Sequence, residues 1–229
     1  MGLDIWYWLL IVATILSLVA SAKVNSTFQK YAQVRSKSNM TGAQVAQRLL
    51  HANGIYDVGI EHISGSLTDH YDPSAKVLRL SNSVYDNTSV AAIAVAAHEC
   101  GHAVQHNVGY APISIRSKLV PIANFGAKIS WPLILIGFLI GGSGSVLLLQ
   151  IGIILFSASV LFQIVTLPVE FNASSRALKF LESNGILASD EHKPAKKVLS
   201  AAAMTYVAAA AVSVIQLLRL IAMMNRRRD

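Results

Sequence analysis

The chain has 229 residues, of which 53% are apolar and only 14% are charged, whereas an average soluble domain carries about 25% charged residues. This composition disfavours a disordered chain, a fibrous one and an ordinary soluble globule, because too few polar residues are available to cover the surface of a globule of this size. It favours an integral membrane protein. The single cysteine excludes an intramolecular disulfide and a cysteine-cluster metal site. We attribute the net charge of +7 to loops that orient the chain in a membrane, and not to nucleic-acid binding, because aromatic and basic residues are not interleaved.

The first apolar segment, 5–22, is long enough to cross a bilayer, which takes about 20 helical residues. It begins with Trp6 and Trp8, and such aromatic side chains favour the bilayer interface. A cleaved signal peptide is the alternative. Signal peptides have basic residues before the apolar core, however, and the one charged residue at this place is Asp4. We therefore interpret the segment as a retained N-terminal anchor.

Segments 119–140 and 146–167 form a predicted transmembrane hairpin, joined by a turn rich in glycine and serine. Pro121 and Pro132 interrupt the first of these segments. We therefore expect its first half to lie along the membrane interface and its span to begin near Trp131.

The fourth apolar segment, 198–221, is rich in alanine and either spans the membrane or packs onto the polar part of the chain. If the first three segments span, the polar stretches before and after the hairpin lie on the same side. Both stretches are rich in Lys and Arg, which predicts that they are cytoplasmic. The three arginines at 226–228 count against a full fourth crossing.

These segments divide the chain into five predicted parts: an N-terminal anchor (1–22), the first part of a cytoplasmic domain (23–118), a transmembrane hairpin (119–168), the second part of that domain (169–197), and a hydrophobic helix with a basic tail (198–229). Within the cytoplasmic domain, periodicity and capping residues predict a helix over 41–51 that begins after Thr41, a strand fragment over 58–63, a turn-rich passage over 67–74, a strand over 76–81, and a helix over 90–107.

The last of these helices contains His98-Glu99-Cys100-Gly101-His102, a match to the H-E-x-x-H pattern. Because residues four apart project from one face of a helix, His98 and His102 can bind the same zinc ion. Glu99 lies beside the first ligand, where it can take a proton from the water that the metal activates and return it to the leaving amine. Composition predicts only about 0.005 chance matches in such a chain. The pattern therefore indicates a catalytic zinc site.

A third protein ligand has to come from outside this helix. His106 lies about 12 Å from His98 along the helix axis, too far for both to bind one tetrahedral ion. The candidates are His51, His62, His70, His192, Asp69, Asp72, Glu170 and Glu182. Glu170 stands out because it follows the third apolar segment and opens a predicted helix. A His₂Glu site with an open fourth position is typical of peptide hydrolysis. The alternative is a carboxylate that stabilises a helix N-terminus.

Substrate handling is less determined by the sequence. The strand over 76–81 is either an ordinary internal strand or an edge to which an extended peptide adds as a further strand. Candidate donors to the oxyanion are Arg176, His192 and Tyr206. Cys100 points away from the two histidines on the helix, so we expect it to face the core.

The chain resembles the YugP-type family of neutral zinc membrane metallopeptidases over nearly its whole length. The resemblance rests on the stretch His98 to His106, on Asp69-His-Tyr-Asp-Pro73 before it and on Glu170-Phe-Asn-Ala-Ser174 after it. More distantly the chain resembles the HtpX heat-shock proteases and the CAAX prenyl proteases.

The resemblance implies a compact gluzincin-like α+β domain, with His98, His102 and Glu170 as zinc ligands and Glu99 as base. Those relatives place an aspartate four residues after the ligating glutamate, where this chain has Ser174. Support for a ligating histidine is then expected from Asn172, Ser174 or another residue.

The sequence thus predicts a mainly α integral membrane protein, with a small α+β zinc protease domain and three or four transmembrane helices. The predicted function is hydrolysis of peptide bonds, in membrane-embedded or other polypeptides, by a multi-pass protein of the cell membrane whose zinc site faces the cytoplasm. A catalytically silent membrane scaffold with structural zinc is the alternative, although a structural site has no need of Glu99. A metal transporter is disfavoured because the motif lies on a polar-domain helix. The oligomeric state is not predicted.

Overall fold

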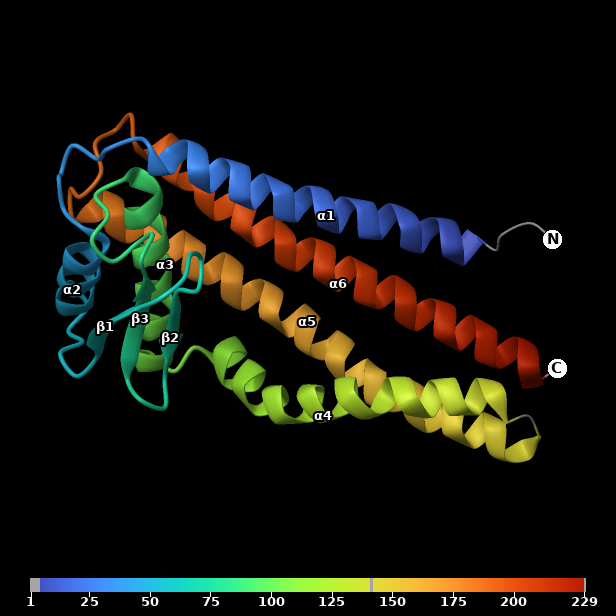
Figure 1. The fold of residues 1–229 in the computed structure, drawn as a ribbon. Helices are drawn as coiled ribbons and strands as arrows, with labels where there is room; N and C mark the ends of the chain where they lie inside the picture. Colours follow the sequence, from blue (N-terminus) through green and yellow to red (C-terminus); the bar gives the residue numbers. More distant parts are fainter. Residues whose placement is uncertain (1–4, 141, 229) are drawn as a thin grey trace. The chain divides into compact units, whose positions relative to one another are not determined.

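The computed structural model describes residues 5–140 and 142–228 (Figure 1). In chain order its elements are α1 (Ile5–Ala32), α2 (Gly42–Ala52), β1 (Gly59–Ile63), β2 (His70–Asp72), β3 (Val77–Ser81), α3 (Val90–Asn107), α4 (Ala111–Leu139), α5 (Ser143–Ser183) and α6 (His192–Arg228). The structure is mainly helical with one small sheet. The predicted fold class is confirmed.

Four of these helices, α1, α4, α5 and α6, are long and apolar enough to cross a membrane by length and composition. The fourth apolar segment is therefore part of a helix that is long enough to cross a membrane. The predicted interruption of the second segment at Pro121 and Pro132 is wrong, because α4 runs continuously through both. That its membrane span begins near Trp131 stays a prediction. A proline removes one backbone hydrogen bond, and membrane helices tolerate this where neighbouring groups satisfy the freed carbonyl.

The chain divides into two compact units, each assembled from separate segments. The helical unit comprises Met1–Val19, Ser114–Pro168 and Tyr206–Asp229, and the polar unit comprises Ala20–Ile113 and Val169–Thr205. Helices α1, α4, α5 and α6 each contribute residues to both units. All the candidate metal ligands named from the sequence belong to the polar unit.

In the helical unit, glycines allow α4 and α5 to pack closely. A Cβ atom at Gly126 would meet the backbone carbonyl of Leu155, and one at Gly152 would lie 2.6 Å from the Ile134 side chain. The Ser159 hydroxyl donates a hydrogen bond to the Ala123 carbonyl, 3.1 Å away. Small residues and interhelical hydrogen bonds of this kind hold helices together in lipid.

The polar unit is built around α3, which packs against α2 and contacts the sheet (Figure 1). Thr41 caps α2 as predicted: its hydroxyl accepts from the Gln44 amide, and the Gln44 side chain accepts from the Thr41 amide. The Ser89 hydroxyl caps α3 in the same way at Ala92. The core between these elements is apolar and buried; it includes Val45, Leu49, Leu50, Leu78, Leu80, Ile93 and Ala97.

The sheet has the strand order β1-β3-β2, in which β3 pairs parallel to β1 and antiparallel to β2. The strand over 76–81 is therefore internal, and the hypothesis that it adds a peptide at a free edge is wrong because both its edges are already paired. The prediction of a turn-rich passage over 67–74 missed β2, a strand of three residues. Among the described strands β2 is an edge strand, and it contacts α3.

The end of α5 that belongs to the polar unit approaches α3 at Gly101. A Cβ atom at this position would lie 2.7 Å from the Ala173 carbonyl oxygen and 3.1 Å from the Ala173 Cα atom. Backbone atoms cannot move aside as a flexible side chain can. Gly101 is therefore needed for close packing of α3 against α5.

Replacing Gly101 with alanine should destabilise the polar unit. We expect Gly101→Ala to lower the free energy of unfolding by about 1–3 kcal/mol, the usual cost of overpacking. Gly144→Ala is the matched control, because no atom lies within 4 Å of a Cβ there and alanine is the better helix former. Thermal unfolding in detergent measures both. Equal stability of Gly101→Ala and the wild type would contradict the packing argument.

Candidate metal centre

The two histidines of the H-E-x-x-H pattern lie on one face of α3, as their spacing predicts. The ring centroids of His98 and His102 are 4.8 Å apart, and the ring planes are nearly perpendicular. Their side chains are only 14% and 11% exposed. The two rings therefore lie side by side in a largely buried place.

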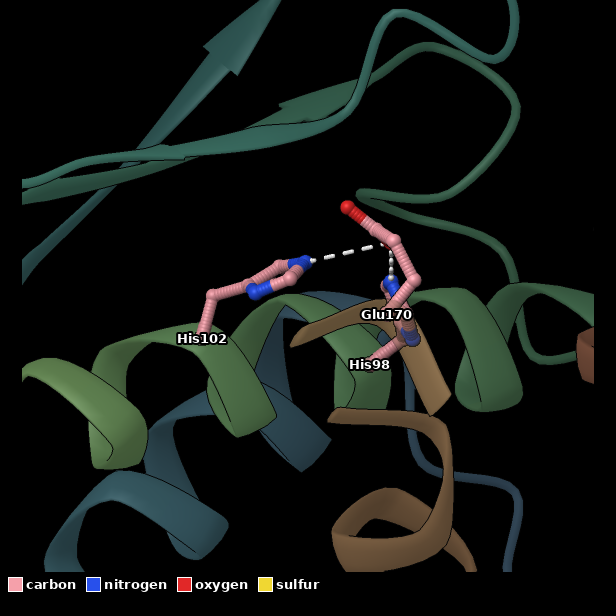
Figure 2. A group of neighbouring side chains, drawn as sticks. All are labelled: His98, His102 and Glu170. Atoms are coloured by element: carbon pink, nitrogen blue, oxygen red, sulfur yellow. Dashed lines mark hydrogen bonds and ion pairs between the residues drawn. The ribbon is translucent and has the colours of Figure 1, made fainter. Parts of the chain in front are cut away.

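Glu170 extends from α5 toward the same two rings (Figure 2). Its Oε2 atom lies 3.2 Å from His98 Nε2 and 3.6 Å from His102 Nε2. The expectation that Glu170 opens a helix is wrong, because α5 begins at Ser143 and runs through this residue to Ser183. The alternative role, stabilising a helix N-terminus, is thereby excluded.

A second layer of polar side chains holds the histidine rings. The Ser174 hydroxyl lies 3.1 Å from His98 Nδ1, at the position where the distant relatives have an aspartate. Gln105 Oε1 lies 3.0 Å from His102 Nδ1. Sequence reasoning anticipated Ser174 as a possible support but missed Gln105, although its spacing of three residues from His102 places both on one helix face.

The charges around this cluster favour a cation. Burial raises the pKa of the Glu99 carboxyl, and His102 and His98 offset only part of that rise. For His102 burial acts against the charged ring, but the carboxylates of Glu170 and Glu99 outweigh it and raise the pKa of the imidazole. Two buried carboxylates beside two imidazoles therefore require positive charge, which protons or a metal ion can supply.

The donor set fits zinc. Ligand atoms of His98, His102 and Glu170 all lie within 4.8 Å of one another. Two imidazole nitrogens and one carboxylate oxygen are ligands that zinc prefers in catalytic sites, where a fourth position stays open. Among the residues that the structure describes, these three form the one group of this kind.

The other candidate ligands from the sequence have different partners. Asp69 accepts hydrogen bonds from the amide and hydroxyl of Ser81, and Asp72 pairs with Arg79. Glu182 is exposed near the end of α5. The remaining histidines contact residues outside the cluster: His51 with Gln47, His62 with Tyr85, His70 with Thr68, His106 with Tyr71 and His192 with Leu187.

Arg176 and His192, proposed as candidate oxyanion donors, have hydrogen-bond partners within the polar unit. Arg176 Nε donates to Asn172 Oδ1 at 2.7 Å, and its guanidinium lies over the Tyr110 ring. His192 Nε2 lies 3.2 Å from the Leu187 carbonyl oxygen. Tyr206 belongs to the helical unit. Cys100 is buried as expected, with Sγ directed at the Ala46 carbonyl.

Comparisons with known proteins agree with this geometry. The family described as "Putative neutral zinc metallopeptidase" matches residues 6–225. The chain is 49% identical over 225 residues to "Putative membrane protease YugP" of Bacillus subtilis (strain 168), an alignment that covers 98% of this chain and 99% of that protein. No solved structure matches significantly. Since the match covers almost the whole sequence, this chain belongs to the putative neutral zinc metallopeptidase family.

Proposed function

We propose that this chain is a membrane-bound zinc endopeptidase of the gluzincin type. In this proposal His98, His102 and Glu170 hold the metal and Glu99 acts as the catalytic base. The observation that carries it is the convergence of two imidazole nitrogens from α3 and one carboxylate oxygen from α5 (Figure 2). The relative's name, a membrane protease, supports the same class of reaction.

Each protein group has a distinct task in this mechanism. Zinc bound here would supply Lewis acidity, which activates water and polarises a peptide carbonyl. Glu99 adjoins the first histidine in a buried setting, where it takes the proton of the attacking water and delivers it to the departing amine. Glu170 and the two histidines would hold the ion, as a set of three ligands typical of catalytic zinc sites.

The presence of Glu99 favours an enzyme over a silent scaffold with structural zinc. A structural site needs only ligands, and it is normally closed by four of them. Here three candidate ligands converge, and a second carboxylate, that of Glu99, is buried beside them. Burying an ionisable group without a task is costly, so its retention favours catalysis.

We propose that polypeptides are cleaved at the cytoplasmic surface of the membrane. The polar unit carries most of the lysines and arginines of the chain, and such residues remain in the cytoplasm. The second part of this unit begins directly after an apolar stretch of α5. A site anchored in this way favours substrates that are themselves membrane proteins or that lie near the bilayer.

The role of Glu99 is tested by Glu99→Gln. The amide keeps the size of the side chain but cannot accept a proton, so we expect unchanged zinc content and at least about a 100-fold loss of turnover. Glu61→Gln, an exposed strand position, is the control. The measurements are metal analysis and digestion of casein or a membrane-protein substrate. A Glu99→Gln protein as active as the wild type would rule out the mechanism.

The role of Glu170 is tested by Glu170→Ala with Glu182→Ala as the matched control on the same helix. Loss of one of three ligands should weaken zinc binding as well as activity, in contrast to Glu99→Gln. Chelator competition measures the zinc affinity of each purified protein. If Glu182→Ala loses zinc and Glu170→Ala does not, the ligand assignment is wrong.

The membrane orientation is tested by cysteine labelling in a Cys100→Ser background. Gln33 and Lys196 are exposed residues of the polar unit, and Gly144 lies in the first turn of α5. We expect Gln33→Cys and Lys196→Cys to react only from the cytoplasmic side and Gly144→Cys only from the opposite side. Labelling of Gln33→Cys and Lys196→Cys from opposite sides would place His98 and Glu170 across a bilayer from each other and refute the shared site.

A further inference from the structure

Gln105 is fully buried and makes three hydrogen bonds, one to His102 on its own helix α3 and two to residues of α5. Its Oε1 atom lies 3.0 Å from His102 Nδ1, while its Nε2 atom lies 2.8 Å from the Val169 carbonyl oxygen and 3.0 Å from Asn172 Oδ1. Asn172 Oδ1 also accepts from Arg176 Nε, 2.7 Å away. These contacts form a continuous chain from Arg176 to a candidate metal ligand.

The outer partners of this series of hydrogen bonds, Val169 and Arg176, determine which atom donates and which accepts in each bond. The Val169 carbonyl can only accept a hydrogen bond, so the Gln105 atom that faces it is the NH₂ group. The Arg176 guanidinium can only donate, so the Asn172 atom that faces it is the carbonyl oxygen. Gln105 therefore presents its own carbonyl oxygen to His102, and His102 Nδ1 has to carry the hydrogen. The lone pair of a neutral ring is then on Nε2, which faces Glu170.

We propose that Gln105, Asn172 and Arg176 are positioning residues for the metal site. They hold the His102 ring in the tautomer and orientation in which Nε2 binds the metal. The inference rests on the proposed zinc site and adds to it three residues that bind no metal themselves. It also links the two helices that supply the ligands, since Gln105 belongs to α3 and its two other partners to α5.

The partners of the two Nδ1 atoms are neutral groups: the Gln105 amide for His102 and the Ser174 hydroxyl for His98. Neither of these two partners is a carboxylate. Hydrogen bonds from neutral groups orient an imidazole but raise its basicity less than a carboxylate does. These residues therefore contribute to zinc affinity mainly by orienting the imidazole rings.

The test is the zinc affinity of purified full-length variants, measured by competition with a chelator of known affinity. Gln105→Leu removes all three hydrogen bonds, and we expect zinc to bind about 10- to 100-fold more weakly. Gln47→Leu is the matched control, because Gln47 also bonds a histidine on a helix but is exposed on α2. It should bind zinc like the wild type.

A second pair of variants separates positioning from general packing. Asn172→Asp retains an acceptor for both Gln105 and Arg176, whereas Asn172→Leu retains none. We expect Asn172→Asp to keep the wild-type zinc affinity and Asn172→Leu to lose it, with similar thermal unfolding of the two metal-free proteins. These two variants also test the positioning role if Gln105→Leu does not fold.

Two results would overturn the inference: a folded Gln105→Leu that binds zinc as tightly as Gln47→Leu, or equal zinc affinities of Asn172→Asp and Asn172→Leu. Both leave the zinc site itself intact. A wild-type protein that binds no zinc, or an active Glu99→Gln, would instead refute the proposed function. The two failures are therefore distinguishable.

Discussion

The candidate site depends on one close contact between two helices. Gly101 lies between the histidines on α3, and its missing side chain lets the backbone of α5 approach at Ala173. Glu170 lies almost one turn before Ala173 on α5, so this approach brings its carboxylate to the two rings. The residue that lies between the two histidines in the sequence thus also lets the carboxylate of Glu170 approach them. The geometry of the candidate site and the packing of the two helices therefore depend on the same residue.

The polar groups around this contact are arranged to be satisfied in a largely buried place. Glu170 faces two imidazoles, and each imidazole has a polar partner on its other nitrogen, Ser174 or Gln105. Buried polar groups are costly unless they are hydrogen-bonded or paired. A divalent cation at the centre would complete this arrangement by meeting the charge of the carboxylates.

Much of this could be predicted from local sequence. The spacing of His98 and His102 and the helix start after Thr41 are determined within a few residues, and the structure has them as expected. Sequence patterns failed where a contact between residues far apart in the sequence determines the structure. Gln105 is a plain polar residue until α5 places Val169, 64 residues away, against it. The strand β2 has three residues in a turn-rich passage, and pairing with β3 alone makes it a strand.

In the membrane part, too, some features could be predicted from the local sequence and others could not. Apolar length predicted the helices, but two prolines suggested a break in α4 that the structure does not have. A proline costs a helix one backbone hydrogen bond. Whether the helix ends at the proline depends on whether neighbouring groups satisfy the freed carbonyl. The place of Glu170 could likewise not be derived from its neighbours alone, because it lies inside a continuous helix and not at its start.

The central claim is that one zinc ion is bound by two histidines and Glu170. X-ray absorption at the zinc edge of the purified protein tests it most directly. The account predicts a shell of nitrogen and oxygen atoms at about 2.0–2.2 Å, with the outer scattering of two imidazole rings and no sulfur at about 2.3 Å. A sulfur shell, a site with no imidazole scattering, or a Glu170→Ala protein with the unchanged spectrum and zinc content would contradict the claim.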